Sequence, residues 1–494
     1  YDQLEPAIVR ETEILRDSPN MLAYWNVDEP NLLNKEARIA AAEWYFKTVD
    51  PIDPYRPQFL LYSKHIPHGD KWTRWGEVLG YDVYPRPYVG GMYSEPGLAT
   101  AYYSCDLRDR CRRDTKVQWF VPLSSHLGPP RAPIGMSRAH LLCQAYTTLI
   151  YGSRGLLYFV LSSVVGEEAW GGLKTIAAQV KMLSPALLEA PPKQVVSYTP
   201  GALRPAERQF PVVNVATFRY PDGAYLLLAA NIKPFAVDST FTVTGLTAVE
   251  RCFHDGVQPP VTASAFTERI EPYGVRAYRL KLDRTDCIEV AVDMAVVPGE
   301  AAPFVDVVAI VQQLKRSRNH CPNPVFRQCT NPGIPDFCKP FFCLGIDLHA
   351  GQQGSDWYLD GETPWNGNPS LRMARRPIDQ ETARGVFAVA YPPPSDTPQT
   401  MTFSFYAKGQ GAKDSVTFVG HGLTKTQKAF PVSETWERYH LTFDVSPAEN
   451  RDMGGRVYIL CPGIGSTVWI NGLQLEEGDQ PTEFRDDSVL KKKR

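Results

Sequence analysis

The chain has 494 residues, more than a single hydrophobic core usually holds, so we expect two to four domains. Hydrophobic residues make up 43% and charged residues 21%, a globular composition that excludes a disordered or fibrous protein. A formal net charge of −2 excludes a nucleic-acid-binding protein that works through a basic surface. No apolar run reaches the roughly 20 residues that cross a bilayer, so we expect no membrane span.

Residues 1–192 alternate short apolar runs with helical patterns. The runs expected to be strands are Met21–Val27, Gln58–Tyr62, Val78–Tyr84, Val117–Leu123 and Gly155–Leu161. The helical patterns are Asn34–Val49, Ala99–Arg113, Ser137–Ile150 and Trp170–Leu188. Strands that are apolar throughout are typical of a parallel sheet covered on both faces. The strand ends carry carboxylates and aromatic residues, which favours a TIM-type (β/α)8 barrel over an open doubly wound sheet.

The remaining chain is predicted to be mostly β. Residues 193–283 hold short alternating runs, with a Pro-Asp-Gly hairpin signal at 221–223, and indicate a small antiparallel β-sandwich. Residues 284–320 are expected to be a connector with one helix, Val305–Leu314. Residues 321–494 contain evenly spaced strands without helices between them and indicate a jelly-roll β-sandwich. The predicted fold class is therefore multidomain α/β plus all-β.

The ten cysteines include two close groups, Cys105 with Cys111, and Cys321, Cys329, Cys338 and Cys343. Neither group has the spacing of a zinc knuckle, so disulfides are the favoured interpretation. Cys143 lies in an apolar helical pattern and is expected to be a buried thiol. Disulfides together with the high proline content indicate a secreted or cell-surface protein.

Two adjacent acids, Asp28 and Glu29, stand at the end of a strand in the run Trp25-Asn-Val-Asp-Glu-Pro30. Cleavage of a glycosidic bond needs one carboxylic acid to protonate the leaving oxygen and a second group to stabilise the cation that develops. Acids at this place also cap helices, so a purely structural role competes with a catalytic one.

The order of motifs resembles the later strands of glycoside-hydrolase barrels whose fourth strand ends in Asp-Glu-Pro. After Trp25–Pro30 come Gly80–Pro85, Val117–Val121, Arg131–Pro133 and the pattern Ala145…Tyr158. The resemblance covers about residues 4–190 and implies that Glu29 is the general acid. It also implies that this strand is the fourth, so strands one to three must be supplied by an upstream segment or another chain, or have been lost.

The sequence departs from those barrels at strand seven, where the usual nucleophilic glutamate is replaced by Leu123-Ser-Ser-His126. Four interpretations stay open. A 2-acetamido group of the substrate could act as nucleophile, oriented by Asp28; Asp82 could be the second carboxylate, in an inverting arrangement; Glu167 or Glu168 could serve; or the barrel is catalytically silent.

Several residues near the predicted barrel mouth are candidates for binding sugar. Aromatic side chains stack on sugar faces, although they are also ordinary core residues. The expected substrate-binding set is Trp25, Tyr84, Trp119, His126, Arg131 and Tyr158.

The C-terminal segment resembles carbohydrate-binding jelly rolls, on residues 331–336, 357–360, 370–372 and 468–478. The resemblance implies a sugar platform, for which Trp357, Tyr358 and Trp365 are the candidates. Such modules often hold a structural calcium, but Asn471 stands where an acid is expected, so calcium is left open.

The sequence therefore predicts a glycoside hydrolase that acts on an extracellular poly- or oligosaccharide, with Glu29, Asp28 and Asp82 as catalytic candidates. The competing hypothesis is a silent structural or glycan-binding surface protein on the same scaffold. We expect carbohydrate as the partner, no nucleic acid, no metal in the active site and no cofactor. A doubly wound cofactor enzyme is disfavoured, because no glycine-rich phosphate loop follows any strand.

Overall fold

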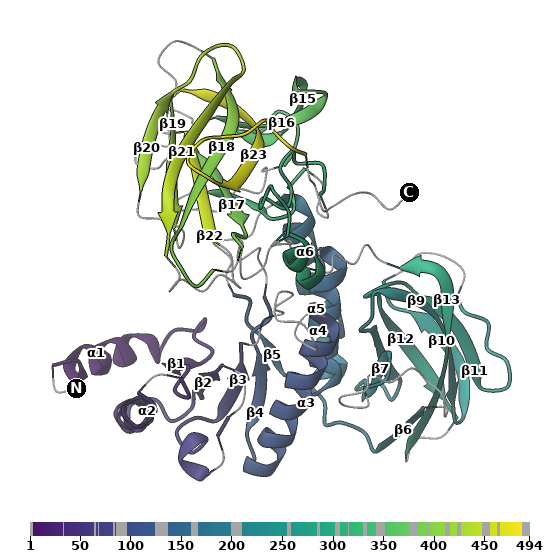
Figure 1. Cartoon of the computed structure of the whole chain (residues 1–494). Coiled ribbons are helices and arrows are strands. Elements are labelled where there is room, and N and C mark those ends of the chain that lie inside the picture. Colours follow the sequence, from purple (N-terminus) through teal and green to yellow (C-terminus); the bar gives the residue numbers. More distant parts are fainter. Residues whose placement is uncertain are drawn as a thin grey trace.

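The structure is a computed structural model (Figure 1). It describes residues 3–32, 34–63, 66–67, 69–82, 84, 96–123, 137–159, 166–198, 210–253, 258–283, 287–301, 307–314, 316–329, 333–341, 351–374, 384–393, 395–410, 415–421, 426–446, 455–461 and 465–486. It combines one α/β region with all-β regions, as the sequence predicts. No helix within these ranges is long and apolar enough to cross a membrane.

The first region is built on a parallel sheet with the strand order β1-β2-β3-β4-β5. Its strands are β1 Tyr24–Asp28, β2 Gln58–Tyr62, β3 Val78–Tyr81, β4 Val117–Phe120 and β5 Gly155–Leu156. The helices are α1 Glu5–Leu15, α2 Lys35–Val49, α3 Pro96–Asp114, α4 Arg138–Ile150 and α5 Gly166–Leu187, with a short 3-10 turn at Asp70–Trp72. Among the described residues the sheet is open, because β1 pairs with β2 alone and β5 with β4 alone.

The two faces of this sheet have different surroundings. Leu60, Leu79 and Phe120 lie on the face that packs against α2 and α3. The other face, called the open face below, carries the buried residues Phe59, Leu61, Val78 and Val121, with Trp119 and Leu157 packed on them. Burial of both faces of the central strands explains why they are apolar without alternation.

The second region is a sandwich of two four-stranded sheets, β10-β12-β8-β7 and β11-β9-β13-β6. Its strands are β6 Gln194–Tyr198, β7 Val213–Arg219, β8 Tyr225–Asn231, β9 Phe235–Val243, β10 Leu246–Arg251, β11 Ala265–Ile270, β12 Val275–Leu282 and β13 Ile288–Ala301. Apolar residues of β7, β8 and β12 share a core with α4 and α5. The sandwich therefore packs on the helices of the first region (Figure 1).

The prediction of a connector at 284–320 is wrong in its first half. β13 lies there, pairing in parallel with β6 and antiparallel with β9. Its alternating residues Ile288, Val290 and Val292 are buried in the sandwich core, so the strand is an integral part of this region. Only the second half holds the expected helix, α6 Val307–Leu314.

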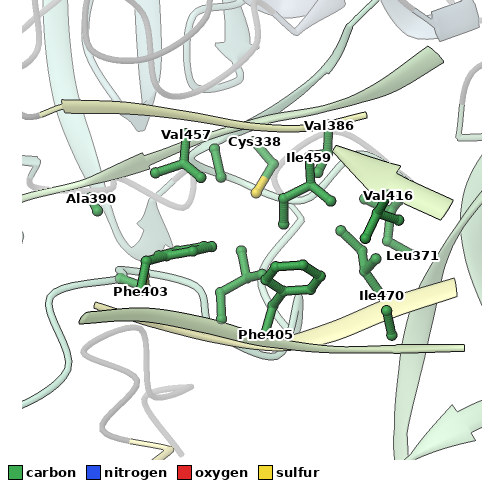
Figure 2. Close-up of a cluster of buried hydrophobic side chains, with 14 of the residues drawn as sticks. Cys338, Leu371, Val386, Ala390, Phe403, Phe405, Val416, Val457, Ile459 and Ile470 are labelled. Carbon is green, nitrogen blue, oxygen red and sulfur yellow. The ribbon is translucent and has the colours of Figure 1, made fainter. Parts of the chain in front are cut away.

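The C-terminal region is a sandwich of two five-stranded sheets, β14-β17-β22-β19-β20 and β15-β16-β23-β18-β21. The strands are β14 Cys338–Phe341, β15 Trp357–Trp365, β16 Asn368–Ala374, β17 Arg384–Ala390, β18 Gln399–Gly409, β19 Ser415–His421, β20 Gln427–Pro431, β21 Glu437–Val445, β22 Gly455–Cys461 and β23 Thr467–Glu477. Figure 2 shows its core, with Phe403 and Phe405 of one sheet facing Val457 and Ile459 of the other.

The cysteines do not form the expected disulfides among the described residues. No disulfide joins any of the nine that the structure describes, and Cys343 lies outside those residues. Cys105 and Cys111 both lie on α3, where a separation of six residues places their Cα atoms about 9 Å apart, too far for a bridge. Cys143 is a buried thiol on α4, as expected.

Candidate active site

Three carboxylates gather at the carboxyl edge of the parallel sheet. Asp28 ends β1, Glu29 follows it, and Asp82 follows β3 directly. Burial raises the pKa of Asp82 to about 8, and the charges of Glu29 and Asp28 contribute to the same shift. Burial, followed by the charge of Glu29, also raises the pKa of Asp28. Since charges interact at this strength only at short range, the three groups form one cluster.

Within the cluster, the Glu29 carboxyl group raises the pKa of Asp82 through its charge and, to a smaller extent, through a hydrogen bond between the two side chains. Two ionised carboxylates cannot hydrogen-bond to each other, because neither carries a hydrogen, so such a pair holds one proton. Asp82 Oδ1 is shielded from solvent and receives no hydrogen bond from any N–H or O–H group in the described part of the chain. Its raised pKa keeps that proton in place at neutral pH.

Tyr84 contributes a hydroxyl to the same cluster. Its Oη lies 3.5 Å from Asp82 Oδ2, at the outer limit of a hydrogen bond. Burial raises the pKa of Tyr84, and the neighbouring carboxylates raise it further, so the hydroxyl stays protonated and can donate. The ring is stacked on Phe159, with centroids 5.6 Å apart and an interplanar angle of 17°.

The backbone at Glu29 is held in an uncommon conformation. Its φ of 45° lies in the left-handed region, which a residue with a Cβ adopts at a cost of roughly 1 kcal/mol. The Glu29 N–H donates to Leu61 O at 2.8 Å, which ties the turn to β2. Arg38 of α2 donates from Nη1 to Asp28 O at 2.7 Å, which fixes the same turn from the helix side.

An aromatic floor lies on the open face of the sheet. The rings of Trp25 and Phe59 meet edge to face at 5.3 Å, and those of Phe59 and Trp119 lie 5.4 Å apart at 38°. Two glycines make room for them: a Cβ at Gly80 would lie 2.5 Å from the Phe59 ring, and one at Gly155 would lie 2.7 Å from Trp119. These rings therefore lie close over the strands, and the Trp25 side chain is 48% exposed.

The structure brings some of the predicted substrate residues together and separates others. Trp25, Trp119 and Tyr84 lie on the open face or beside the carboxylates. Tyr158 does not: it packs among residues of α5 and lines an apolar cavity of about 550 Å³ with Trp170. We correct that expectation, because this strand position points to the helix side. His126 and Arg131 lie outside the described residues.

The acids Glu167 and Glu168 lie in the first turn of α5, where the helix dipole stabilises negative charge. Glu168 accepts a hydrogen bond from the backbone N–H of Arg138 at 3.2 Å. These contacts account for the two acids as helix-start residues.

In the C-terminal sandwich, Trp357 is not a sugar platform. Its side chain is 0% exposed and lies in the core, where Nε1 donates to Gly385 O at 3.1 Å. Tyr358, the next residue along the strand, faces the opposite side and lies beneath the Arg372 guanidinium. Trp365 is half-buried against Tyr406, with ring centroids 4.4 Å apart.

No group of three or more His, Cys, Asp or Glu side chains in the described residues could hold a metal ion. Asn471, where the resemblance led us to look for a calcium ligand, is fully buried and donates from Nδ2 to Pro369 O at 2.9 Å.

Sequence reasoning missed Arg38, which fixes the turn at Glu29, and Phe59 with Gly80, which shape the aromatic floor. Side chains alternate along a strand, so Val78, Gly80 and Asp82 share one face of the sheet. Phe59 of the neighbouring strand pairs with Val78 and lies on the same face, so alternation counted back from Asp82 could have identified both Gly80 and Phe59. Nothing in the sequence marks Arg38, since its role is to bind two backbone carbonyls, those of Asp28 and Glu29.

Comparison with known proteins gives no family. No family model matches the chain, and no curated protein matches it. Among solved structures, it is similar to a GH51 arabinofuranosidase from Xanthomonas axonopodis pv. citri, at 11% identity and a TM-score of 0.34, over 56% of this chain and 73% of that one.

Two carbohydrate-binding modules are also similar to part of the chain. A family 61 module, solved in complex with β-1,4-galactotriose, matches at 10% identity and a TM-score of 0.24, over 33% of this chain and 100% of that one. The xylan-binding CBM22-1 domain from Paenibacillus barcinonensis matches at 11% identity and a TM-score of 0.22, over 32% of this chain and 93% of that one. Because all three TM-scores are below 0.5, none supports an inference about what this chain does.

Proposed function

We propose that this chain is a glycoside hydrolase that acts outside the cell on a poly- or oligosaccharide. The observation that carries the proposal is the cluster of Glu29 and Asp82, in which burial and the neighbouring acids raise the pKa of Asp82 to about 8, so that one carboxyl group stays protonated at neutral pH. A glycosidic oxygen leaves only when an acid protonates it, and a carboxyl group with a raised pKa can do so near pH 7. The aromatic floor beside the pair offers surfaces on which sugar rings can stack.

The spacing of the pair favours one mechanism among those considered. Two catalytic carboxyl groups stand about 5–5.5 Å apart in retaining enzymes and about 6.5–9.5 Å apart in inverting ones. Hydrogen-bonded carboxyl groups are closer than either, so Glu29 and Asp82 act together as a single proton donor. The nucleophile must then be another group, and a 2-acetamido oxygen of the substrate fits this requirement.

In the proposed reaction, the proton that Asp82 and Glu29 share passes through Glu29 to the glycosidic oxygen as the bond from that oxygen to the anomeric carbon breaks. The acetamido oxygen attacks the anomeric carbon, while Asp28 accepts a hydrogen bond from the acetamido N–H. Water then attacks the anomeric carbon and opens the cyclic intermediate, and a proton of that water returns to the pair of Glu29 and Asp82. Asp82 keeps the pair singly protonated, and Tyr84 donates to Asp82 throughout.

The test is hydrolysis of aryl glycosides with and without a 2-acetamido group. Glu29→Gln and Asp82→Asn should each lower turnover of the acetamido substrates by about 10²–10⁴-fold, the usual contribution of a general acid. The control is Glu36→Gln, the same change at an exposed residue that pairs with Lys71. Activity of Glu29→Gln equal to that of the native protein would contradict the proposal.

A pH profile tests the proton donor separately. Because the pair loses its proton as the pH rises through about 8, turnover should fall on the alkaline side with an apparent pKa near that value. In Asp82→Asn this alkaline limb should be lost or move, because the group whose pKa is raised to about 8 is gone.

The second candidate function is a protein that binds glycans but does not hydrolyse them. It is favoured by the open sheet, because β1 and β5 each have one neighbour among the described strands and Trp25 is half exposed. This candidate predicts retention on sugar matrices without turnover, and retention that is unchanged in Glu29→Gln.

A further inference from the structure

Four side chains form a continuous row across one sheet of the C-terminal sandwich. Tyr358 of β15 is paired with Arg372 of β16, Arg372 with Trp469 of β23, and Trp469 with Lys408 of β18. Their strand neighbours Trp357, Met373, Val468, Ile470 and Ala407 are buried in the core. Since side chains alternate along a strand, this row, called the cationic row below, lies on the outer face of the sheet.

Aromatic rings and cations alternate along the cationic row. Arg372 Cζ lies 5.5 Å from the ring centroid of Tyr358 and 5.9 Å from that of Trp469. Lys408 Nζ lies 5.6 Å from the same indole on its other side. All four side chains keep partial exposure, so they can meet a ligand.

A buried carboxylate fixes the central ring. Trp469 Nε1 donates to Asp360 Oδ2 at 2.7 Å. Burial alone would raise the pKa of Asp360, but hydrogen bonds from Trp469 and from the backbone N–H groups of Glu362 and Thr363 lower it overall. The carboxylate is therefore ionised and already engaged, and the indole is held in one orientation, which reduces the entropy that a ligand must overcome.

The two cations of the row form no ion pair with any residue that the structure describes. No Asp or Glu of the described ranges forms an ion pair with Arg372 or Lys408, and Arg372 donates from Nη1 to Ser355 O at 2.9 Å. Arg438 on the same sheet differs, because it lies 3.9 Å from Glu476. Among the described residues, the cationic row thus presents two positive charges without an ion-pair partner, one on each strand beside a fixed aromatic ring.

We propose that the cationic row binds an acidic polysaccharide, with a sugar ring stacked on Trp469 and its carboxylate or sulfate groups paired with Arg372 and Lys408. Neighbouring strands are about 4.8 Å apart, so these two cations stand on strands about 10 Å apart, a separation suited to acidic groups on different sugars of one extended chain. Planar guanidinium groups bind carboxylate and sulfate through two parallel hydrogen bonds, which gives geometry as well as charge.

The experiment is gel retardation and titration calorimetry of the full chain at physiological salt. The probes are polygalacturonic acid, its fully methyl-esterified form and single-stranded DNA. The acid polymer should bind, and the ester and the DNA should bind at least roughly tenfold more weakly. Trp469→Ala, and the double change Arg372→Met with Lys408→Met, should each lower affinity for the acid polymer by roughly tenfold or more.

The matched control is Lys428→Met, which removes a lysine that also contacts an aromatic ring, Phe430, but on the other sheet. It should leave binding unchanged, and thermal unfolding should show that every variant is folded. No binding of the acid polymer, equal binding of DNA, or unchanged affinity in Trp469→Ala would overturn the proposal. Glu29→Gln leaves the cationic row intact, so this variant should bind the acid polymer with the affinity of the native protein. The binding test therefore stands even if the proposed hydrolase activity is absent.

Discussion

The C-terminal sandwich and the N-terminal parallel sheet differ in how completely their apolar side chains are covered. In the C-terminal sandwich two sheets cover each other, and Phe403 and Phe405 are each 1% exposed (Figure 2). In the parallel sheet one face is covered by helices, and on the open face Phe59, Leu61 and Val78 are also buried, but Trp25 of the edge strand is 48% exposed. Since covering apolar surface is the main source of stability, the first arrangement serves folding. The second leaves the Trp25 ring, at the edge of the sheet, as apolar surface on which a ligand or further chain can pack.

The largest expected effect lies in the closed core. Phe403→Ala should destabilise the C-terminal sandwich by about 3–5 kcal/mol, because it removes a buried ring and leaves a cavity. Hydrogen–deuterium exchange of peptides from β18 and β23 measures this loss locally. A loss below about 1 kcal/mol would show that the core is less closely packed than described.

The next largest effect is expected from Asp82, the buried acid at the edge of the parallel sheet. Unfolded Asp82 ionises near pH 3.8, whereas folded Asp82 keeps its proton up to about pH 8. The protonated Asp82 contributes fully to the free energy of unfolding below pH 3.8, and this contribution is lost as the pH rises towards 8. The region of the parallel sheet should therefore become less stable over that range. Asp82→Asn should remove this dependence and stabilise the region by on the order of 1–3 kcal/mol at pH 8.5. Urea unfolding at pH 4.5 and 8.5 compares the two proteins.

A smaller effect is expected at the turn of Glu29. Glycine adopts positive φ without a steric cost, so Glu29→Gly should be more stable than Glu29→Gln by up to about 1 kcal/mol. Both changes remove the carboxylate, and their difference isolates the backbone. Asn34→Gly is the control, at a φ of 52°; its gain should be smaller, since asparagine tolerates this region. Equal midpoints for the two Glu29 variants would mean that the turn is not strained.

The smallest effect should come from Trp25→Ala, which is the counterpart of the core substitution. Because Trp25 is half exposed, the cost in unfolding free energy should be about 1 kcal/mol or less. Binding or turnover of sugars should suffer more than stability does. A cost as large as that of Phe403→Ala would mean that something covers the open face in solution.

The sequence predicted most of the parallel sheet because its strands are short, largely apolar runs separated by helical patterns. It did not predict β13, since Ile288–Ala301 mixes small, acidic and apolar residues that also suit a linker. The carboxylates Asp28, Glu29 and Asp82 were found because parallel strands end at one edge.

Side-chain direction was harder to predict. The pairing register shifts between Trp25 and Asp28, so strict alternation fails there: Trp25 contacts Phe59 on the open face, while Val27 packs on the helix side. In β15, alternation places Trp357 and Tyr358 on opposite faces but does not say which face is the core. That choice depends on the second sheet, which lies far away in the sequence.

The glycines beneath the aromatic floor constrain how this protein can vary. A side chain at Gly80 would collide with the Phe59 ring, and one at Gly155 with Trp119, so neither glycine can change alone. Any relative with a larger residue at the position of Gly80 should carry a smaller one at Phe59, and the same should hold for Gly155 and Trp119. Paired substitution at these positions in an alignment would show that selection preserves this aromatic floor.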